Sequence, residues 1–183
     1  MSPNLTPWIN MPTVEKEQAA RDAASILKTV WAQSVTPVPL PVDPIRIAAS
    51  MGIEVFDEVL DANVSGVIVK RPGQDPVILL NMTDSPNRQR FTCAHEIGHF
   101  VAHSNDLATD HYAYIDERGK LASAGTDPDE VYANEFAACL LMPEDVVRQL
   151  HKEKRTPAEI AAIFRVSDDA MTFRFKNLGL SVP

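Results

Sequence analysis

The sequence predicts an α+β domain in which a short sheet of three or slightly more strands packs on a long helix, followed by a helical module. Three observations lead to this prediction. The β-rich runs are confined to residues 53–80, capped helical segments surround them, and the chain after Pro143 has a helical pattern alone. We therefore expect an N-terminal helical segment at 1–36, a core at 37–143 and a helix-turn-helix-like module at 144–183, packed on the core.

Periodicity and capping residues define the elements of the first half. An amphipathic pattern predicts a helix over 14–32, and a proline-rich connector over 36–44 ends it. Asp43-Pro44 joins an N-cap residue to an N1 proline, so a short helix is expected from there to Gly52. The three β-rich runs then predict strands at 53–58, 66–70 and 77–80.

The same capping signals continue through the middle of the chain. Ser85-Pro86 predicts the start of a long helix that reaches about residue 103. Residues 104–128 are polar and interrupted by glycine and proline, so we expect a loop with little regular structure. Asp127-Pro128 opens a further helix, which runs through Leu141.

Three short helices are expected after Pro143. Thr156-Pro157 caps the second, Ser167 caps the third, and Gly179 suits a helix end. The apolar side chains of the second and third helices predict a packed core, made by Ile160, Ile163, Phe164, Val166 and Phe173.

Composition excludes several classes of protein. A net charge of −8 disfavours a generic nucleic-acid binder. The charge is uneven, because the segment from Arg148 onward has a net charge of +3 and the residues before it have a net charge of −11. No apolar run approaches the ~20 residues that a bilayer requires. The N-terminus lacks the pattern of a signal peptide, and the cysteines Cys93 and Cys139 lack metal-site spacing, so we expect reduced thiols and a cytoplasmic location.

A His-Glu-x-x-His motif carries the clearest chemical signal. His95 and His99 are one helical turn apart and can converge on one metal ion, while Glu96 is placed to act as a general base. This pattern is typical of zinc-dependent peptidases. The ordinary alternative is a helix that carries two histidines as surface or core residues.

A peptidase zinc needs a third protein ligand, because three ligands leave one position for water. His103 lies too far along a straight helix to close on the same ion. Glu130 on the following helix is the better candidate, and Asn134 falls one turn later on the same face. Asn134 is expected to accept a hydrogen bond from the distal ring nitrogen of a ligand histidine.

At these residues the chain resembles the ImmA/IrrE family of zinc metallopeptidases. The resemblance is carried by RQRFTCAHEIGH at 88–99 and EVYANEFAACLLMP at 130–143, and it extends over most of the chain after about residue 36. It implies a zincin-like core with a gluzincin-like site, in which His95, His99 and Glu130 bind zinc, Glu96 is the catalytic acid and base, and Asn134 supports a ligand. Mn²⁺ or another divalent ion also suits this ligand set.

The resemblance implies a zinc metalloendopeptidase that cleaves one specific protein. That substrate is expected to be an XRE-type helix-turn-helix repressor of a phage, mobile element or stress-response system, so that cleavage releases transcription. His111, Tyr112 and Tyr114 are candidate donors to the oxyanion or substrate. The strand over 66–70, expected at a sheet edge, is a candidate to align an extended peptide.

Two alternatives belong to other classes. The helices around 158–177 have a helix-turn-helix pattern in the positively charged segment, which suits a DNA-binding regulator with a vestigial metal site. Against it, Asp168 and Asp169 begin the second helix, where negative charge repels phosphate. The other alternative is an antitoxin-like binding partner without turnover, which shares every fold feature with the enzyme. The sequence does not determine the oligomeric state.

Overall fold

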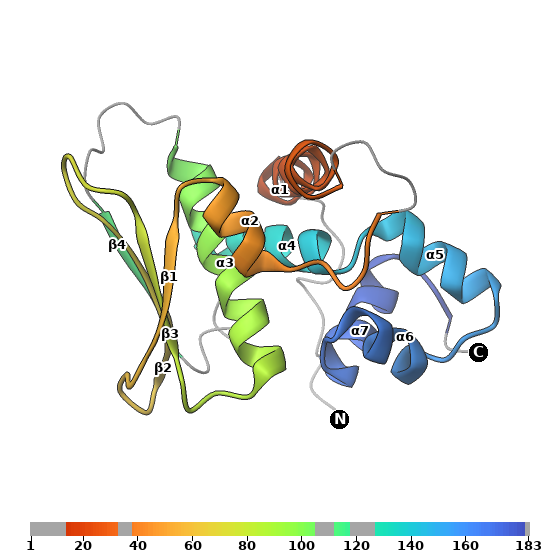
Figure 1. Ribbon diagram of the computed structural model, residues 1–183. Coiled ribbons are helices and arrows are strands. Elements are labelled where there is room, and N and C mark those ends of the chain that lie inside the picture. Colours follow the sequence, from red (N-terminus) through yellow and green to blue (C-terminus); the bar gives the residue numbers. More distant parts are fainter. Residues whose placement is uncertain (1–13, 33–37, 105–111, 118–126, 182–183) are drawn as a thin grey trace, which may run out of the picture.

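The structure, a computed structural model, describes residues 14–32, 38–104, 112–117 and 127–181 (Figure 1). A small sheet lies on one side and a long helix crosses its face, with a short helix beside both and most of the remaining helices beyond the long one (Figure 1). In chain order the elements are α1 (Val14–Ile26), a π-helical turn η1 (Leu27–Trp31), α2 (Pro44–Ser50), β1 (Glu54–Glu58), β2 (Val64–Lys70), β3 (Val77–Asn81), α3 (Pro86–His103), β4 (Tyr112–Glu117), α4 (Pro128–Leu141), α5 (Glu144–Lys152), α6 (Pro157–Phe164) and α7 (Asp168–Asn177).

The predicted α+β class is confirmed, and most elements lie where the sequence places them. The capping predictions hold in detail, because the side chains of Asp43, Ser85 and Asp127 accept hydrogen bonds from backbone N–H groups of the helices that follow. Each of these residues stands before a proline at the first helical position, which fixes the start of the helix from local sequence alone.

The sheet differs from the prediction in two respects. Its four strands have the order β1-β3-β2-β4, with β1 parallel to β3 and β2 antiparallel to both neighbours. The loop predicted over 104–128 is wrong at Tyr112–Glu117, which forms β4 against β2. The strand over 66–70 is consequently not at an edge, because β2 lies between β3 and β4. A six-residue strand whose partner is distant in sequence has only a weak local signal, so its pairing was missed.

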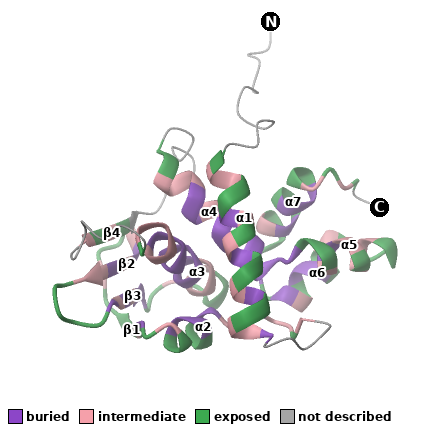
Figure 2. Ribbon diagram, turned by 90° about the horizontal axis from the view of Figure 1, so that it is seen from above, coloured by how far each residue is buried: buried purple, intermediate pink, exposed green. Residues whose placement is uncertain are grey.

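The long helix α3 occupies the middle of the fold. It contacts β2, β3 and β4 on one side and α4 on the other, and α1 packs on α4 beyond it. All residues from Thr92 to His99 are buried, and the middle of the helix is enclosed (Figure 2). The core around it contains Ile68, Ile78 and Leu80 from the sheet, Cys93 and Ile97 from α3, and Phe136 and Leu140 from α4.

The C-terminal helices follow the predicted caps. Thr156 forms a complete capping box with Glu159, Ser167 caps α7, and Gly179 adopts a positive φ of 65° just after α7 ends. The predicted core is buried at Ile160, Phe164 and Val166, and Ile163 packs against it. Phe173 is a wrong prediction: its side chain is 51% exposed, because Met171, Arg174 and Phe175 form the inner face of α7 instead.

Two arginines join this module to the rest of the molecule. Arg90 on α3 donates to the backbone carbonyls of Val42 and Phe164, at 2.7 and 3.3 Å. Arg174 on α7 is 4% exposed; its Nε donates to the carbonyl of Met142 at 3.1 Å, and its Nη1 lies 3.4 Å from a carboxylate oxygen of Glu135. These contacts join the C-terminal helices to α3 and α4, while the division into domains at residues 36 and 143 stays a prediction.

Replacement of Arg174 by alanine is expected to lower the free energy of unfolding by about 2–4 kcal/mol, because it removes the cation from a partly buried carboxylate and the donor from a buried carbonyl. Equilibrium urea unfolding measures this change. The matched control is Arg21→Ala, since Arg21 is 59% exposed and pairs with Glu17 on the surface of α1. That change should cost at most about 0.5 kcal/mol. Equal effects at both positions would show that the Arg174 contacts do not hold the module.

Among the residues that the structure describes, no helix combines the length and apolar character needed to cross a bilayer.

Candidate metal centre

His95, His99 and Glu130 meet in one cluster between α3 and α4. Nε2 of His95 lies 3.0 Å from Nε2 of His99, and the Glu130 carboxylate oxygens lie 3.5 and 3.4 Å from these two nitrogens. A tetrahedral zinc ion with bonds of about 2.1 Å requires ligand atoms about 3.4 Å apart. The three side chains therefore present two imidazole nitrogens and a carboxylate at the spacing of one metal ion. The donor set fits a divalent ion such as zinc.

Asn134 contacts the cluster from one turn further along α4. Its Oδ1 lies 3.2 Å from Nδ1 of His95, so this ring nitrogen donates and Nε2 keeps its lone pair directed at the cluster. Burial, and to a lesser extent the neighbouring His99, lowers the pKa of His95 to about 3. The imidazole is therefore neutral at pH 7, which is the form that binds a metal.

Glu96 lies beside the cluster and is fully buried. Gly66 of β2 allows the strand to approach α3 closely at Thr92, next to Glu96, and is a position that the sequence did not single out. A Cβ on Gly66 would lie 2.3 Å from Cγ2 of Thr92 and 3.5 Å from Oε1 of Glu96. A glycine inside a β-rich run is the signal that was available, because it marks a close approach of another chain segment.

Gly98 has the same role on the opposite side of α3. A Cβ at this position would lie 3.0 Å from Cα of Ala133 and 3.3 Å from the Ala133 carbonyl oxygen. Because these are backbone atoms of α4, the missing side chain sets the distance between the helix that carries His95 and His99 and the helix that carries Glu130. A glycine in the interior of a long helix indicates such a packing requirement.

The candidate oxyanion or substrate residues have different surroundings. His111 lies outside the described residues. Tyr114 on β4 stacks on the ring of His99, with centroids 4.5 Å apart and an interplanar angle of 3°. Its hydroxyl lies 2.7 Å from Nε2 of His103. The ring of Tyr112 is 5.6 Å from that of Tyr114 and 6.0 Å from that of His103. The predicted donor role of these tyrosines stays a prediction.

His103, excluded as a third ligand, is a neighbour of the cluster instead. Besides Tyr114, its Nε2 lies 3.3 Å from a carboxylate oxygen of Asp129, the residue before Glu130. These contacts join the end of α3, the start of α4 and β4 beside the metal cluster.

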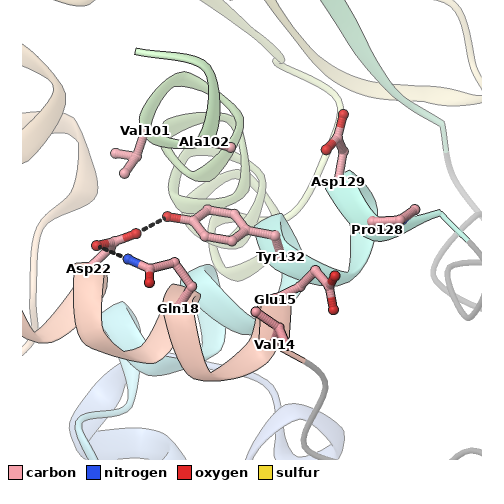
Figure 3. A pocket seen from close by; sticks show the side chains of 9 residues that line it. All are labelled: Val14, Glu15, Gln18, Asp22, Val101, Ala102, Pro128, Asp129 and Tyr132. Atoms are coloured by element: carbon pink, nitrogen blue, oxygen red, sulfur yellow. Dashed lines mark hydrogen bonds between the residues drawn. The ribbon is translucent and has the colours of Figure 1, made fainter. Parts of the chain in front are cut away.

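A cleft of about 380 Å³ lies close by but has none of the three cluster residues in its lining. It is formed by the start of α1, the end of α3 and the start of α4 (Figure 3). The hydroxyl of Tyr132 donates to Asp22 across it at 2.6 Å, which fastens α1 to α4. The cleft therefore lies between these three helices and does not contain the cluster.

Comparison with known sequences agrees with this geometry. Residues 48–176 match the profile of the peptidase M78 family, described as an IrrE N-terminal-like domain. The chain belongs to this family. The match spans both helices of the cluster, α3 and α4, and confirms the resemblance noted in the sequence.

The chain is also similar to the radiation response metalloprotease IrrE of Deinococcus radiodurans. The two are 42% identical over 76 residues, which are 40% of this chain and 21% of that protein. The matched segment thus spans about a fifth of the length of this relative.

Proposed function

We propose that the chain is a zinc-dependent endopeptidase. The observation that carries this proposal is the convergence of His95, His99 and Glu130 beside the buried Glu96. When bound there, the ion supplies Lewis acidity, which acidifies water and polarises a peptide carbonyl. The two imidazoles and one carboxylate would hold it and leave a coordination position for a reactant. Membership of a peptidase family supports the same reaction.

Glu96 is the residue that moves the proton in this proposal. Its carboxylate removes a proton from the attacking water and then delivers it to the amine of the departing peptide. The burial of Glu96 excludes bulk water from competing for that proton. Asn134 keeps the His95 ring in the tautomer that the site needs.

Zinc is the ion that we propose, because a His/His/Glu set is a ligand set of zinc peptidases. Mn²⁺ accepts the same imidazole and carboxylate donors. Metal analysis of protein purified without added metal distinguishes the two ions. The proposed location is the cytoplasm, where both cysteines remain reduced, in keeping with their burial as free thiols.

The substrate would bind as an extended segment along β4. This strand pairs with β2 through one edge, and no described strand pairs with its other edge. Tyr114 of β4 contacts His99, so a peptide added to this edge would pass beside the metal cluster. Backbone pairing at a sheet edge gives affinity for a flexible segment, and contacts with the alternate side chains of that segment give specificity. β4 thus takes the role that we had expected of the strand over 66–70.

The proposed substrate is an XRE-type helix-turn-helix repressor, cut once so that the genes it controls are released. Family membership supports this proposal, and the recorded role of the D. radiodurans relative in a radiation response is compatible with it. The test incubates the zinc-loaded protein with the repressor encoded beside its gene and, separately, with unfolded casein. Intact-mass analysis should show one cut in the repressor and uncut casein. Degradation of casein at many sites would show a general protease, and an intact repressor would contradict the proposed substrate.

The DNA-binding alternative has less support. The exposed first turn of α7 carries Asp168 and Asp169, and Arg174 is buried against the core. A helix with this charge distribution meets phosphate groups unfavourably. A gel-shift titration at several salt concentrations tests the point, because steeply salt-dependent binding to duplex DNA would favour the alternative. The non-catalytic alternative predicts that the zinc-loaded protein binds the repressor without cutting it, so cleavage of the repressor would exclude it.

A further inference from the structure

The two histidines of the metal cluster are supported differently. A histidine that binds a metal ordinarily donates its other ring nitrogen to an oxygen, which fixes the orientation of the ring. Asn134 provides this oxygen for His95. Nδ1 of His99 is buried and has no hydrogen-bond partner within the part of the chain that the structure describes. Some other contact must therefore hold the plane of the His99 ring.

The flat ring of Tyr114 is that contact. It lies parallel to the His99 imidazole, with an interplanar angle of 3° and a centroid separation of 4.5 Å. Stacking at this separation is attractive and restricts rotation of the imidazole about its χ2 angle, because rotation would drive the ring edge into the partner. An aliphatic side chain of similar volume has no flat face and would not restrict the rotation in the same way.

Tyr114 is itself held by a second imidazole of α3. Its ring also stacks on His103, at 4.9 Å and 18°, and its hydroxyl is hydrogen-bonded to Nε2 of that residue. His103 in turn contacts Asp129, the neighbour of Glu130. The tyrosine thus contacts two imidazoles that are one turn apart on α3.

We propose that Tyr114 is a positioning residue for the metal ligand His99, and that its ring replaces the hydrogen bond that Nδ1 of this histidine lacks among the described residues. The inference rests on the proposed metal site. It adds that the affinity of this site for the metal depends on a residue of β4. A side chain that only filled space at this position would affect stability and leave metal affinity unchanged.

The test compares Tyr114→Phe, which keeps the ring, with Tyr114→Leu, which removes it. Tyr112→Leu is the matched control, because Tyr112 lies on the same strand and is also a partly buried neighbour of His103. Zinc affinity is measured by competition with a chromophoric chelator, the visible spectrum of the Co²⁺-loaded protein reports ligand geometry, and melting of the metal-free protein reports stability.

We expect Tyr114→Leu to lower zinc affinity by about 10–100-fold and to alter the Co²⁺ spectrum. Tyr114→Phe should stay within about threefold of wild type, since most of the ring contact remains. Tyr112→Leu should lower the melting temperature without changing either metal measurement. Wild-type affinity and spectrum in Tyr114→Leu would overturn the inference and leave the proposed function intact. A wild-type protein that bound no metal would overturn both.

Discussion

Replacing Glu96 with glutamine is expected to abolish peptide hydrolysis while metal binding stays intact. Glutamine has nearly the same shape but cannot accept the proton of the attacking water, and general base catalysis contributes about 10²–10⁴-fold to such a reaction. Glu96 is adjacent to the metal cluster and not one of its three members. The measurements are kcat for cleavage of the substrate and the dissociation constant for zinc.

His95→Ala is the informative companion to this variant. It removes a member of the cluster, so both cleavage and tight zinc binding should be lost, whereas Glu96→Gln should lose cleavage alone. Cleavage by Glu96→Gln within tenfold of the wild-type rate would show that another group is the base. A large loss of zinc affinity in the same variant would show that Glu96 binds the metal instead.

Gly98→Ala is expected to destabilise the protein and weaken its metal site together. Alanine favours helix by about 0.5–1 kcal/mol over glycine, but overpacking of a core costs about 1–3 kcal/mol. The added Cβ would approach Cα of Ala133 to 3.0 Å, and backbone cannot move aside as a flexible side chain does. We therefore expect a net loss of about 1–2 kcal/mol in the free energy of unfolding. Zinc affinity should also fall, because α4 carries Glu130.

Asn87→Ala is the control for helix propensity. Asn87 is exposed in the first turn of α3, so alanine there changes the helix without touching α4. It should be neutral or slightly stabilising, and zinc affinity should not change. Urea unfolding and chelator competition measure both quantities. If Gly98→Ala were as stable as Asn87→Ala and bound zinc equally well, close packing of α3 on α4 would not set the geometry of the site.

The helices could be predicted because their signals are local. Asp43, Ser85 and Asp127 each precede a proline at the first helical position, and the capping contacts follow from these dipeptides. The proximity of His95 and His99 is local too, since it needs only helical spacing. The prediction that Glu130 and Asn134 share one helix face is also local, because it follows once the helix that begins at Pro128 is recognised.

Features that depend on tertiary contacts could not be read in this way. β4 forms through pairing with β2, and the residues of β4 alone do not indicate a strand. Without β4, the inner position of β2 in the sheet could not be predicted either. The exposure of Phe173 depends on which face of α7 meets the core. The stacking of Tyr114 on His99 joins a strand to a helix, and no spacing rule connects the two residues.

Titration of the metal-free protein with Zn²⁺, with substrate cleavage followed in the same samples, tests metal-dependent hydrolysis at this cluster most directly. We predict no cleavage before zinc is added, a rise in proportion to the zinc added, and a plateau at one ion per chain. Glu130→Gln, which removes a charged member of the cluster, should require far more zinc to reach any activity. Equal cleavage with and without zinc, or a plateau that Glu130→Gln does not shift, would contradict the assignment of this site.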